Sequence, residues 1–281
     1  MGRLTARTCI VTGGAGGLGS ATARRLCAEG GQVVIADIML EPAKALAAEI
    51  RAAGGDAIAL YLDLGAPDSI AKLIGDTLAH YGKLEVIFNN GAATNSEFLN
   101  RDGMAGDMDI DVWDETFKIN ARGTMLMIKH GLPALIASGS GAIINTSSGA
   151  ALLGDLARTA YAASKSAVNA LTLYVAAQYG KQGVTCNVIS PGMVPTATSR
   201  ANQPELIRMV ERHHLTPELG YPEDIAAMVA LLASEDGRFV SGQILRVDGG
   251  VSKAFAHVAD NRDQFETHVT NTWGSSGGGT A

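Results

Sequence analysis

The stretch Thr12-Gly13-Gly14-Ala15-Gly16-Gly17-Leu18-Gly19 follows a short β-branched run and leads into a segment rich in alanine and leucine. Its glycines let the main chain turn sharply and approach a ligand closely. A helix that begins at such a turn directs its unpaired N–H groups and its positive dipole end at a phosphate. A glycine-rich turn alone can be merely structural. Because this one joins a predicted strand to a predicted helix, it indicates a turn that binds the pyrophosphate of a dinucleotide.

The same alternation of short β-branched runs and longer segments of helical period continues along the chain, as in βαβ units of a parallel sheet. Such sheets bury both faces, which explains uniformly apolar runs such as Val33 to Ala36. The predicted strands are Thr8 to Thr12, Gln32 to Asp37, Ala57 to Leu62, Leu84 to Asn89, Ala142 to Ser147, Val184 to Ile189 and Gln243 to Val247. The predicted helices are Gly17 to Glu29, Glu41 to Ala53, Pro67 to Tyr81, Val112 to Ala137, Thr159 to Tyr179 and Pro222 to Ala233. The fold class is therefore α/β, with a doubly wound, seven-stranded parallel sheet flanked by helices.

The composition is typical of a compact protein that acts on a small molecule. The 281 residues are 47% hydrophobic and 18% charged, which excludes global disorder and allows one large core. A net charge of -6 argues against a nucleic-acid binder or a polybasic membrane surface, and no run approaches the roughly 18 apolar residues of a membrane span. Cys9, Cys27 and Cys186 form no Cys-x-x-Cys pair. We expect a cytoplasmic protein without nucleic-acid or membrane partners.

The acidic residue at the end of the second predicted strand bears on the choice of dinucleotide. A carboxylate at Asp37 can accept hydrogen bonds from the adenosine ribose, whereas a 2′-phosphate there would meet like-charge repulsion. Ile38 and Met39 supply no arginine to compensate. We therefore expect NAD; the alternative is that Asp37 only caps the next helix. Asp63, at the end of the third strand, is expected to bind the adenine amino group or else to be a turn aspartate.

Tyr161 and Lys165 lie four residues apart in a segment of helical period, so both side chains project from one face. A free tyrosine, with a pKa of about 10, is a poor base at neutral pH. A nearby ammonium group favours the phenolate and lowers that pKa, which suits an acid/base that moves an alcohol proton. Ser148 can hydrogen-bond the same substrate oxygen. Singly, the three are compatible with a helix-surface pair and a helix cap; together, behind a dinucleotide turn, they indicate catalysis.

Separated motifs stand in a fixed order along the chain. They are Thr12-Gly-x-x-x-Gly17-x-Gly19, Asn89-Asn90-Gly91-Ala92, Ile119-Asn120-Ala-Arg-Gly123, Ser147-Ser148, Tyr161-x-x-x-Lys165, Pro191-Gly192 and Val247-Asp248-Gly249-Gly250. With this set the chain resembles the short-chain dehydrogenase/reductase family from about Leu4 to Gly250. The family usually has Asn-Asn-Ala-Gly where this chain has Asn-Asn-Gly-Ala, a small-for-small exchange that we expect to preserve close cofactor approach and to alter loop flexibility.

The resemblance implies a Rossmann-like fold in a single domain, residues 1–250, and hydride transfer between a nicotinamide and an alcohol or carbonyl group. It implies that Tyr161 is the general acid/base and that Ser148 orients the substrate oxygen. Lys165 would bind the nicotinamide ribose and lower the pKa of Tyr161, and Asn120 would support a water-linked proton relay. The cofactor-binding residues are then Gly13, Gly16, Gly17, Leu18, Gly19, Asp37, Ile38, Asp63, Leu64, Asn90, Gly91, Ala92, Tyr161, Lys165, Pro191, Gly192, Val194 and Thr196.

Two long segments interrupt the βα rhythm. The segment 191–219 has the length of a binding loop, and the resemblance implies a mobile substrate lid there; its apolar residues are expected to be substrate walls or helix packing. Ala93 to Asp111 is expected to be a loop whose aspartates, Asp102 among them, are solvated rather than a calcium site. We expect no metal at His213 and His214, because adjacent helical histidines point in different directions. Trp113 and Phe117 are expected to pack in a core or subunit contact.

The leading interpretation is an NAD-dependent dehydrogenase of secondary alcohols, or ketone reductase in reverse, with a largely apolar cyclic or aromatic substrate. A 3-ketoacyl carrier-protein reductase shares the catalytic residues, but Asp37 disfavours the NADPH that this role generally implies. Similar enoyl reductases place the tyrosine and lysine further apart. A non-catalytic NAD-binding redox sensor would be expected to lack Tyr161, Lys165 or Ser148. The resemblance also favours a homotetramer that shares the helices Val112 to Ala137 and Thr159 to Tyr179.

The segment after Gly250 departs most from the family, in which most chains stop within several residues of this glycine pair. Phe265, Val269 and Trp273 recur at intervals of four, which predicts one apolar stripe on a helix. We expect residues 251–273 of this C-terminal extension to dock across a neighbouring subunit or to close the pocket, and the last residues, Gly274 to Ala281, to be disordered. The alternative is a frayed tail throughout.

Overall fold

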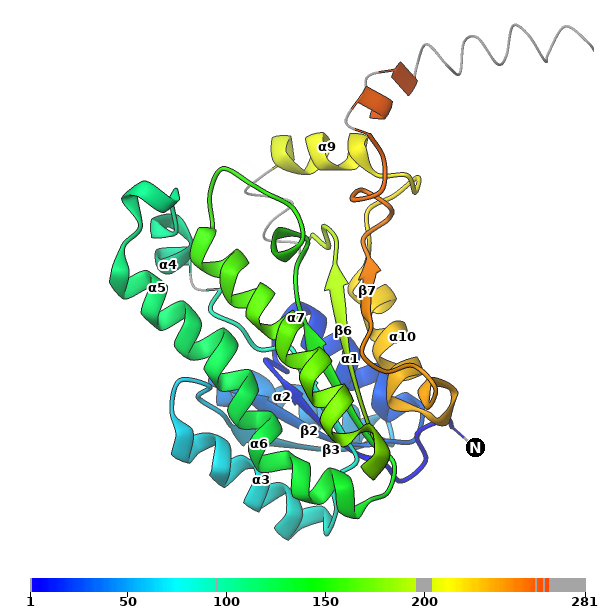
Figure 1. Cartoon of the computed structure of the whole chain (residues 1–281). Helices are drawn as coiled ribbons and strands as arrows, with labels where there is room; N and C mark the ends of the chain where they lie inside the picture. Colours follow the sequence, from blue (N-terminus) through cyan, green and yellow to red (C-terminus); the bar gives the residue numbers. More distant parts are fainter. Residues whose placement is uncertain (1, 95, 196–203, 256, 260, 263–281) are drawn as a thin grey trace, which may run out of the picture. The chain divides into compact units, whose positions relative to one another are not determined.

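A computed structural model describes residues 2–94, 96–195, 204–255, 257–259 and 261–262. The chain forms two compact units: the larger contains residues 1–192 and 221–247, and the smaller contains residues 193–220 and 248–281. The larger unit holds the whole sheet (Figure 1).

Seven parallel strands in the order β3-β2-β1-β4-β5-β6-β7 form the sheet. The strands are β1 (Thr8–Thr12), β2 (Gln32–Asp37), β3 (Asp56–Tyr61), β4 (Val86–Asn89), β5 (Gly141–Thr146), β6 (Val184–Pro191) and β7 (Ile244–Val247). The order reverses between β1 and β4, which are neighbours although two strands separate them in sequence. Ligands of open α/β sheets bind at such a point, outside the carboxyl ends of the strands. The predicted α/β class with a doubly wound, seven-stranded parallel sheet is confirmed.

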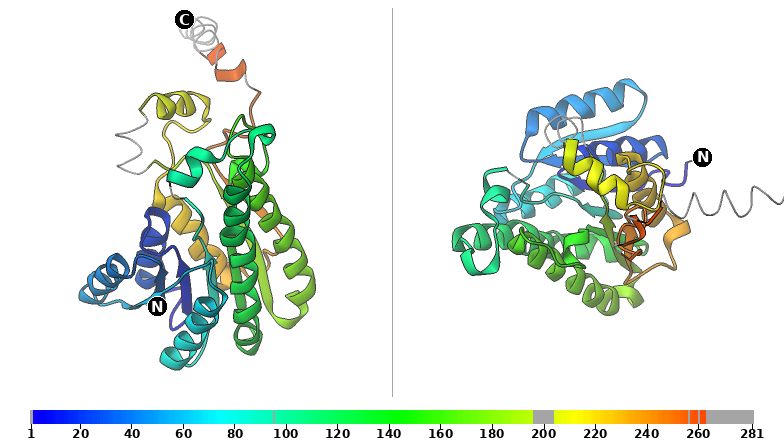
Figure 2. Two further views of the ribbon diagram at one scale, coloured as in Figure 1. Left: turned by 90° about the vertical axis from the view of Figure 1, so that its left-hand side faces the viewer. Right: turned by 90° about the horizontal axis from the view of Figure 1, so that it is seen from above.

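Helices cover both faces of this sheet. They are α1 (Gly17–Ala28), α2 (Leu40–Ala52), α3 (Pro67–Tyr81), α4 (Ser96–Arg101), α5 (Ile110–Phe117), α6 (Gly123–Ala137), α7 (Thr159–Tyr179) and α10 (Pro222–Ala233). Helix α1 packs against α10 and α2 on one face, and α6 packs against α3 and α7 on the other. Figure 2 shows these two helical layers with the strands between them.

The core lies between the sheet and both layers. Strands β1, β4 and β5 are buried along their whole length, as expected of runs that are apolar on both faces. The largest fully buried side chains include Phe88, Ile10, Ile35, Ile87 and Ile143 from the strands, with Leu26, Ile70, Leu73, Met127 and Leu135 from the helices. This core holds the carboxyl ends of the strands in place, where the candidate site residues follow.

The expectation of one continuous helix over Val112 to Ala137 is wrong in one respect, because a π-helical turn, Lys118–Arg122, separates α5 from α6. Two contacts account for it. The Asn120 side chain bonds to groups on both sides of the turn, and a Cβ at Gly123 would lie 2.8 Å from the carbonyl oxygen of Leu64. Local widening of a helix is a usual response to such constraints and is frequent at functional sites.

The segment Ala93 to Asp111 also differs from the predicted solvated loop. It contains α4 and a short 3₁₀ turn, Ala105–Asp107. Asp102, expected in solvent, is only 3% exposed, because its carboxylate accepts main-chain N–H groups at the start of α7. Asp109 instead caps α5 by accepting from the N–H of Asp111 and of Val112.

The smaller unit contains α9 (Pro204–His213) and a segment of the C-terminal extension. Within it the main-chain N–H of Leu215 donates to Gly249 O at 2.8 Å. The guanidinium of Arg262 donates to the carbonyl oxygens of Arg212 and His214, the last of α9 and the residue after it. The expected stripe of Phe265, Val269 and Trp273 lies outside the described residues. No helix in the described ranges is both long and apolar enough to cross a membrane.

Candidate active site

The glycine turn connects β1 to α1 as predicted. Gly13 has a φ of +61°, which favours glycine, and a Cβ at Gly19 would collide with the carbonyl oxygen of Gly13. Helix α1 begins at Gly17 with Gly16 as its N-cap, which provides no side-chain cap, and no acidic residue stands in the first turn. The first N–H groups of α1 therefore keep their capacity to bind an anion such as a pyrophosphate.

Asp37, at the end of β2, joins this turn to the next helix. Its two carboxylate oxygens accept from the N–H of Ala15 and of Met39, both at 2.9 Å. Asp37 is largely buried, whereas the side chains of Ile38 and Met39 are each 60% exposed. The carboxylate thus places negative charge beside the glycine turn, and the two residues after it place apolar groups in solvent.

Residues after β4 lie against the glycine turn across the point where the strand order reverses. The Asn90 amide donates to the carbonyl oxygens of Thr12 and Gly13, and the Thr12 hydroxyl accepts from the N–H of Asn90 and of Gly91. A Cβ at Gly13 would lie 2.8 Å from the Cα of Gly91. The main chains therefore approach closely, which leaves a flat, narrow cradle of the kind a dinucleotide occupies.

The unusual order Asn-Asn-Gly-Ala has a structural correlate. A Cβ at Gly91, where the family usually has alanine, would lie 2.8 Å from Leu64 Cδ1. The leucine end would have to shift to admit it. Asp63, just before Leu64, accepts from the Gly65 N–H at 2.8 Å and acts as a turn aspartate in this structure; its expected contact with adenine stays a prediction.

Ser148, Tyr161 and Lys165 come together at the carboxyl end of β5. Ser148 follows this strand, and its hydroxyl is hydrogen-bonded to the Tyr161 phenol. The Lys165 ammonium donates to Thr146 O at 2.8 Å and lies 5.8 Å from the centre of the Tyr161 ring. The predicted triplet is thus one cluster, with the tyrosine and lysine on one face of α7.

Burial has opposite effects on the two titratable groups of this cluster. It raises the pKa of Tyr161, while the hydrogen bond from Ser148 and the charge of Arg158 lower it. Burial lowers the pKa of Lys165 to about 8, because a low dielectric disfavours the charged ammonium. The lowered tyrosine pKa expected from the sequence is not found: desolvation outweighs the neighbouring charge, and that charge comes from Arg158.

Asn120 lies in the π-helical turn and is fully buried. Its side-chain oxygen accepts from the Ala93 N–H at 2.8 Å, and its amide donates to Ser164 Oγ at 3.0 Å. Ser164 Oγ in turn donates to the carbonyl oxygen of Tyr161 at 2.7 Å. Asn120 is therefore joined to the catalytic helix through Ser164, and its part in a water-linked relay stays a prediction.

The remaining predicted cofactor residues lie near the end of β6. Pro191 ends this strand, and the Gly192 N–H donates to Val247 O at 2.9 Å, which continues the pairing of β6 with β7. Val194 belongs to the smaller unit, and Thr196 lies outside the described residues. Ala92 follows Gly91 in the loop after β4 and is partly buried.

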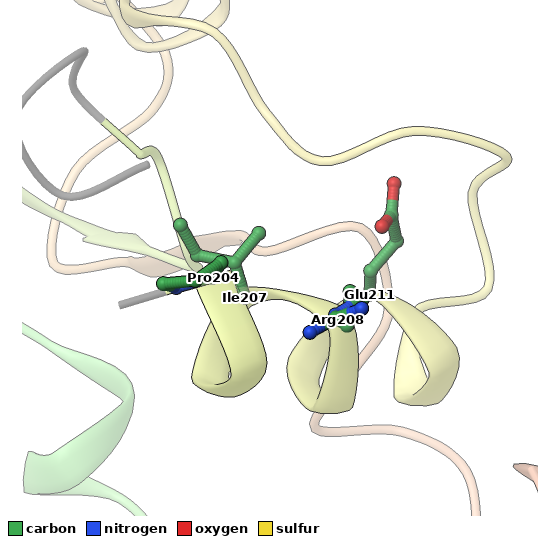
Figure 3. Close-up of a pocket in the computed structure, with 4 residues that line it drawn as sticks. All are labelled: Pro204, Ile207, Arg208 and Glu211. Carbon is green, nitrogen blue, oxygen red and sulfur yellow. The ribbon is translucent and has the colours of Figure 1, made fainter. Parts of the chain in front are cut away.

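The smaller unit has a hollow of its own along α9. It has a volume of about 400 Å³ and is lined by Pro204, Ile207, Arg208 and Glu211 (Figure 3). Of the apolar residues expected to be walls or packing, Ile207 is buried, whereas Met209 and Leu215 are exposed. His214 is buried, with Nδ1 2.8 Å from Val210 O, and the described residues contain no histidine, cysteine or carboxylate group that could hold a metal.

Comparison with known proteins shows what this arrangement is similar to. A family model described as enoyl-(acyl carrier protein) reductase matches residues 13–252. A 7alpha-hydroxysteroid dehydrogenase of Bacteroides fragilis is 39% identical over 253 residues, 90% of this chain and 96% of that protein. A probable short-chain type dehydrogenase/reductase of Bradyrhizobium diazoefficiens is 39% identical over 94% of this chain and 92% of its own. The chain belongs to the short-chain dehydrogenase/reductase family.

Similarity within the short-chain dehydrogenases extends to a cyclohexanol dehydrogenase of Acinetobacter sp., 31% identical over 86% of this chain and 94% of that protein. These relatives are dehydrogenases, so this short-chain dehydrogenase/reductase is an oxidoreductase.

Sequence reasoning missed two residues around the catalytic tyrosine of this short-chain dehydrogenase. Arg158, three residues before Tyr161, carries the charge that lowers its pKa. Asp102 accepts from the main-chain N–H of Tyr161 at 2.8 Å. The proximity of Arg158 along the chain was a usable signal, whereas nothing local connects Asp102 with a residue so far along the sequence.

Proposed function

We propose that this protein is an NAD-dependent dehydrogenase of secondary alcohols, or ketone reductase in reverse, whose substrate is cyclic or aromatic and largely apolar. The observation that carries the proposal is the cluster of Ser148, Tyr161 and Lys165 at the carboxyl end of the sheet, the edge at which the glycine turn also opens.

The residues of the turn fit a dinucleotide. The absence of side chains at Gly13, Gly19 and Gly91 allows the main chains to lie close together, and the start of α1 can receive a pyrophosphate. The Asp37 carboxylate lies where an adenosine ribose would follow and has neutral neighbours at Ile38 and Met39. This charge pattern supports NAD over NADP. When bound, NAD accepts a hydride from an alcohol carbon, and NADH returns one to a ketone.

The side chains of the cluster can manage the proton that accompanies this transfer. In alcohol oxidation, a Tyr161 phenolate takes the proton of the substrate hydroxyl, and the phenol returns it when a ketone is reduced. The Ser148 hydroxyl, already bonded to the phenol, can hold the substrate oxygen beside it. The Lys165 ammonium and the Arg158 charge favour the phenolate. Protein residues thus supply the acid/base and the orientation.

The proposed substrate class rests on the relatives. Their names include a hydroxysteroid dehydrogenase and a cyclohexanol dehydrogenase, both of which act on ring-bearing alcohols. The family model's description names an enoyl reductase, but the spacing of four between Tyr161 and Lys165 favours alcohol chemistry. A 3-ketoacyl carrier-protein reductase is the second candidate, because it would use the same cluster.

The first experiment is a turnover screen over cyclic, aromatic and aliphatic secondary alcohols with NAD, with 3-hydroxyacyl thioesters included. We expect cyclic alcohols to be the best substrates. Tyr161→Phe should lower kcat about 10²- to 10⁴-fold, the usual worth of a general acid/base, with the Kd for NADH within about twofold of wild type. Tyr174→Phe, a change at an exposed tyrosine of the same helix, should keep wild-type kcat. A preference for 3-hydroxyacyl thioesters would favour the second candidate.

The second experiment tests the cofactor. The ratio of kcat/KM for NAD over NADP should exceed one in the wild type. The double change Asp37→Ser with Ile38→Arg should narrow the ratio, because it removes a like charge and adds a phosphate partner. Met39→Arg alone is the control, since it adds a charge while Asp37 remains. Equal values for the two cofactors in the wild type would contradict the choice of NAD.

We further propose a cytoplasmic homotetramer, with the domain boundary at residue 250. The free, buried state of Cys9, Cys27 and Cys186 supports a reducing compartment.

A further inference from the structure

Helix α7, which carries the proposed acid/base, begins without a cap from its own neighbouring residue. Its N-cap residue, Arg158, is in the left-handed region, with φ of +63°, and makes no side-chain cap bond. A left-handed arginine costs free energy unless its surroundings hold it. The first N–H groups of a helix also need partners when they are buried. Something else must therefore stabilise the start of α7.

Asp102 supplies these partners from another part of the sequence. Its Oδ1 accepts from the Ala160 N–H at 2.9 Å, and its Oδ2 accepts from the Tyr161 N–H at 2.8 Å. Its carbonyl oxygen accepts from the Arg158 N–H at 2.8 Å, and the Thr159 hydroxyl donates to Gly103 O at 2.8 Å. Four hydrogen bonds thus join one short segment to the first turn of α7.

Burial makes this contact strong and sensitive to change. Asp102 is 3% exposed and Ala160 is fully buried. A carboxylate at a helix N-terminus is favoured by the helix dipole and by charge-assisted bonds to N–H groups. If the carboxylate is removed, both N–H groups lose their acceptor in a place that solvent hardly reaches.

The same segment also reaches the second catalytic element. The N–H of Ala93, near its beginning, donates to Asn120 in the π-helical turn. Asp102, near its end, binds the N–H of Tyr161 itself. The segment after β4 is therefore held at two points by residues of the candidate site, and its position and that of Tyr161 depend on each other.

We propose that Asp102 is a positioning residue for the acid/base, which holds the main chain of Tyr161 so that its phenol meets Ser148 and the substrate oxygen. This inference rests on the proposed function. A displacement of the reacting groups by about 1 Å can lower a rate about 100-fold without weakening ligand binding. A cap that served stability alone would change the melting temperature and leave kcat of the folded protein unchanged.

The test compares Asp102→Ala and Asp102→Asn with wild type, Asp107→Asn and Tyr161→Phe. Asp107 is the matched control, an exposed carboxylate in the same segment. For each folded protein we would measure kcat and KM for the best cyclic alcohol, the Kd for NADH and the melting temperature. We expect kcat to fall about tenfold in Asp102→Asn, which keeps one acceptor, and about 100-fold in Asp102→Ala, with KM and Kd within about twofold. Asp107→Asn should match wild type.

A wild-type kcat in both Asp102 variants, beside an inactive Tyr161→Phe, would overturn the positioning role and leave the proposed function standing. So would a rise in KM and Kd as large as the fall in kcat. If Asp102→Ala does not fold, Asp102→Asn alone decides between these outcomes. An active Tyr161→Phe would overturn the proposed function itself, and with it the inference.

Discussion

Tyr161 is subject to two opposed effects, desolvation by the surrounding protein and the favourable contacts of its neighbours. Desolvation is the larger, so the pKa of the phenol lies above its ordinary value. The phenol is therefore protonated at neutral pH and ready to donate in ketone reduction. Alcohol oxidation needs the phenolate, so its rate should increase as the pH rises toward the pKa of Tyr161.

Arg158 gives this expectation a test at a single residue. Because its charge lowers the pKa of Tyr161, Arg158→Gln should move the pH midpoint of alcohol oxidation upward, by up to about one unit. The shift should shrink in high salt, since the arginine is exposed. Arg158→Lys keeps the charge and serves as the control. A midpoint that does not move in Arg158→Gln would show that the arginine has no effect on the reacting phenol. The measurement is kcat/KM against pH at two ionic strengths.

Helix α9 and the C-terminal extension are joined by a contact between elements. Arg262 donates to the carbonyl oxygens of Arg212 and His214 at 3.4 and 3.0 Å. A guanidinium at a helix C-terminus satisfies unpaired carbonyl groups and complements the helix dipole. Within the smaller unit, the extension thus acts as a cap of the helix in the proposed substrate lid.

Removal of this cap should loosen α9. We expect Arg262→Ala to raise KM for a bulky cyclic alcohol severalfold, to leave the Kd for NADH unchanged and to speed proteolysis between Pro204 and His213, because the last turn loses about 0.3–1 kcal/mol. Deletion of Gly274 to Ala281 is the control and should be silent. Wild-type KM and proteolysis in Arg262→Ala would mean that the extension does not support the lid. Steady-state kinetics and limited proteolysis provide both readouts.

The larger unit as a whole leaves apolar side chains exposed on the two helices proposed for subunit contacts. Met125 of α6 is 38% exposed, and Leu173 and Tyr174 of α7 are 49% and 68% exposed. Apolar groups gathered on neighbouring helices are typical of a surface that a second copy covers.

The tetramer is tested by placing a charge on this surface. Tyr174→Glu should reduce the mass in solution from that of a tetramer to that of a dimer or monomer, because the buried carboxylate would lack a partner. Tyr61→Glu is the matched control, at a half-exposed tyrosine of β3, an end strand of the sheet, and should keep the wild-type mass. Light scattering after size-exclusion chromatography measures both. A wild-type mass in Tyr174→Glu would exclude α7 as the interface.

The sequence by itself determined the features that depend on neighbours along the chain. Gly13 to Gly19 predicted the turn, because only glycine tolerates its main-chain conformation and close approaches. The apolar runs predicted all seven strands, because both faces of a parallel sheet are buried. The spacing of four placed Tyr161 and Lys165 on one helical face, because the helix repeats every 3.6 residues.

Only the tertiary structure decided the features that depend on contacts between distant segments. Asp102 looked like a loop carboxylate, and its burial at α7 follows from the path of a segment that no periodicity encodes. The π-helical turn at Asn120 likewise depends on partners from two other segments. The pKa of Tyr161 rises although a lysine stands four residues away, because desolvation depends on all the atoms packed around the phenol and spacing reports only one of them.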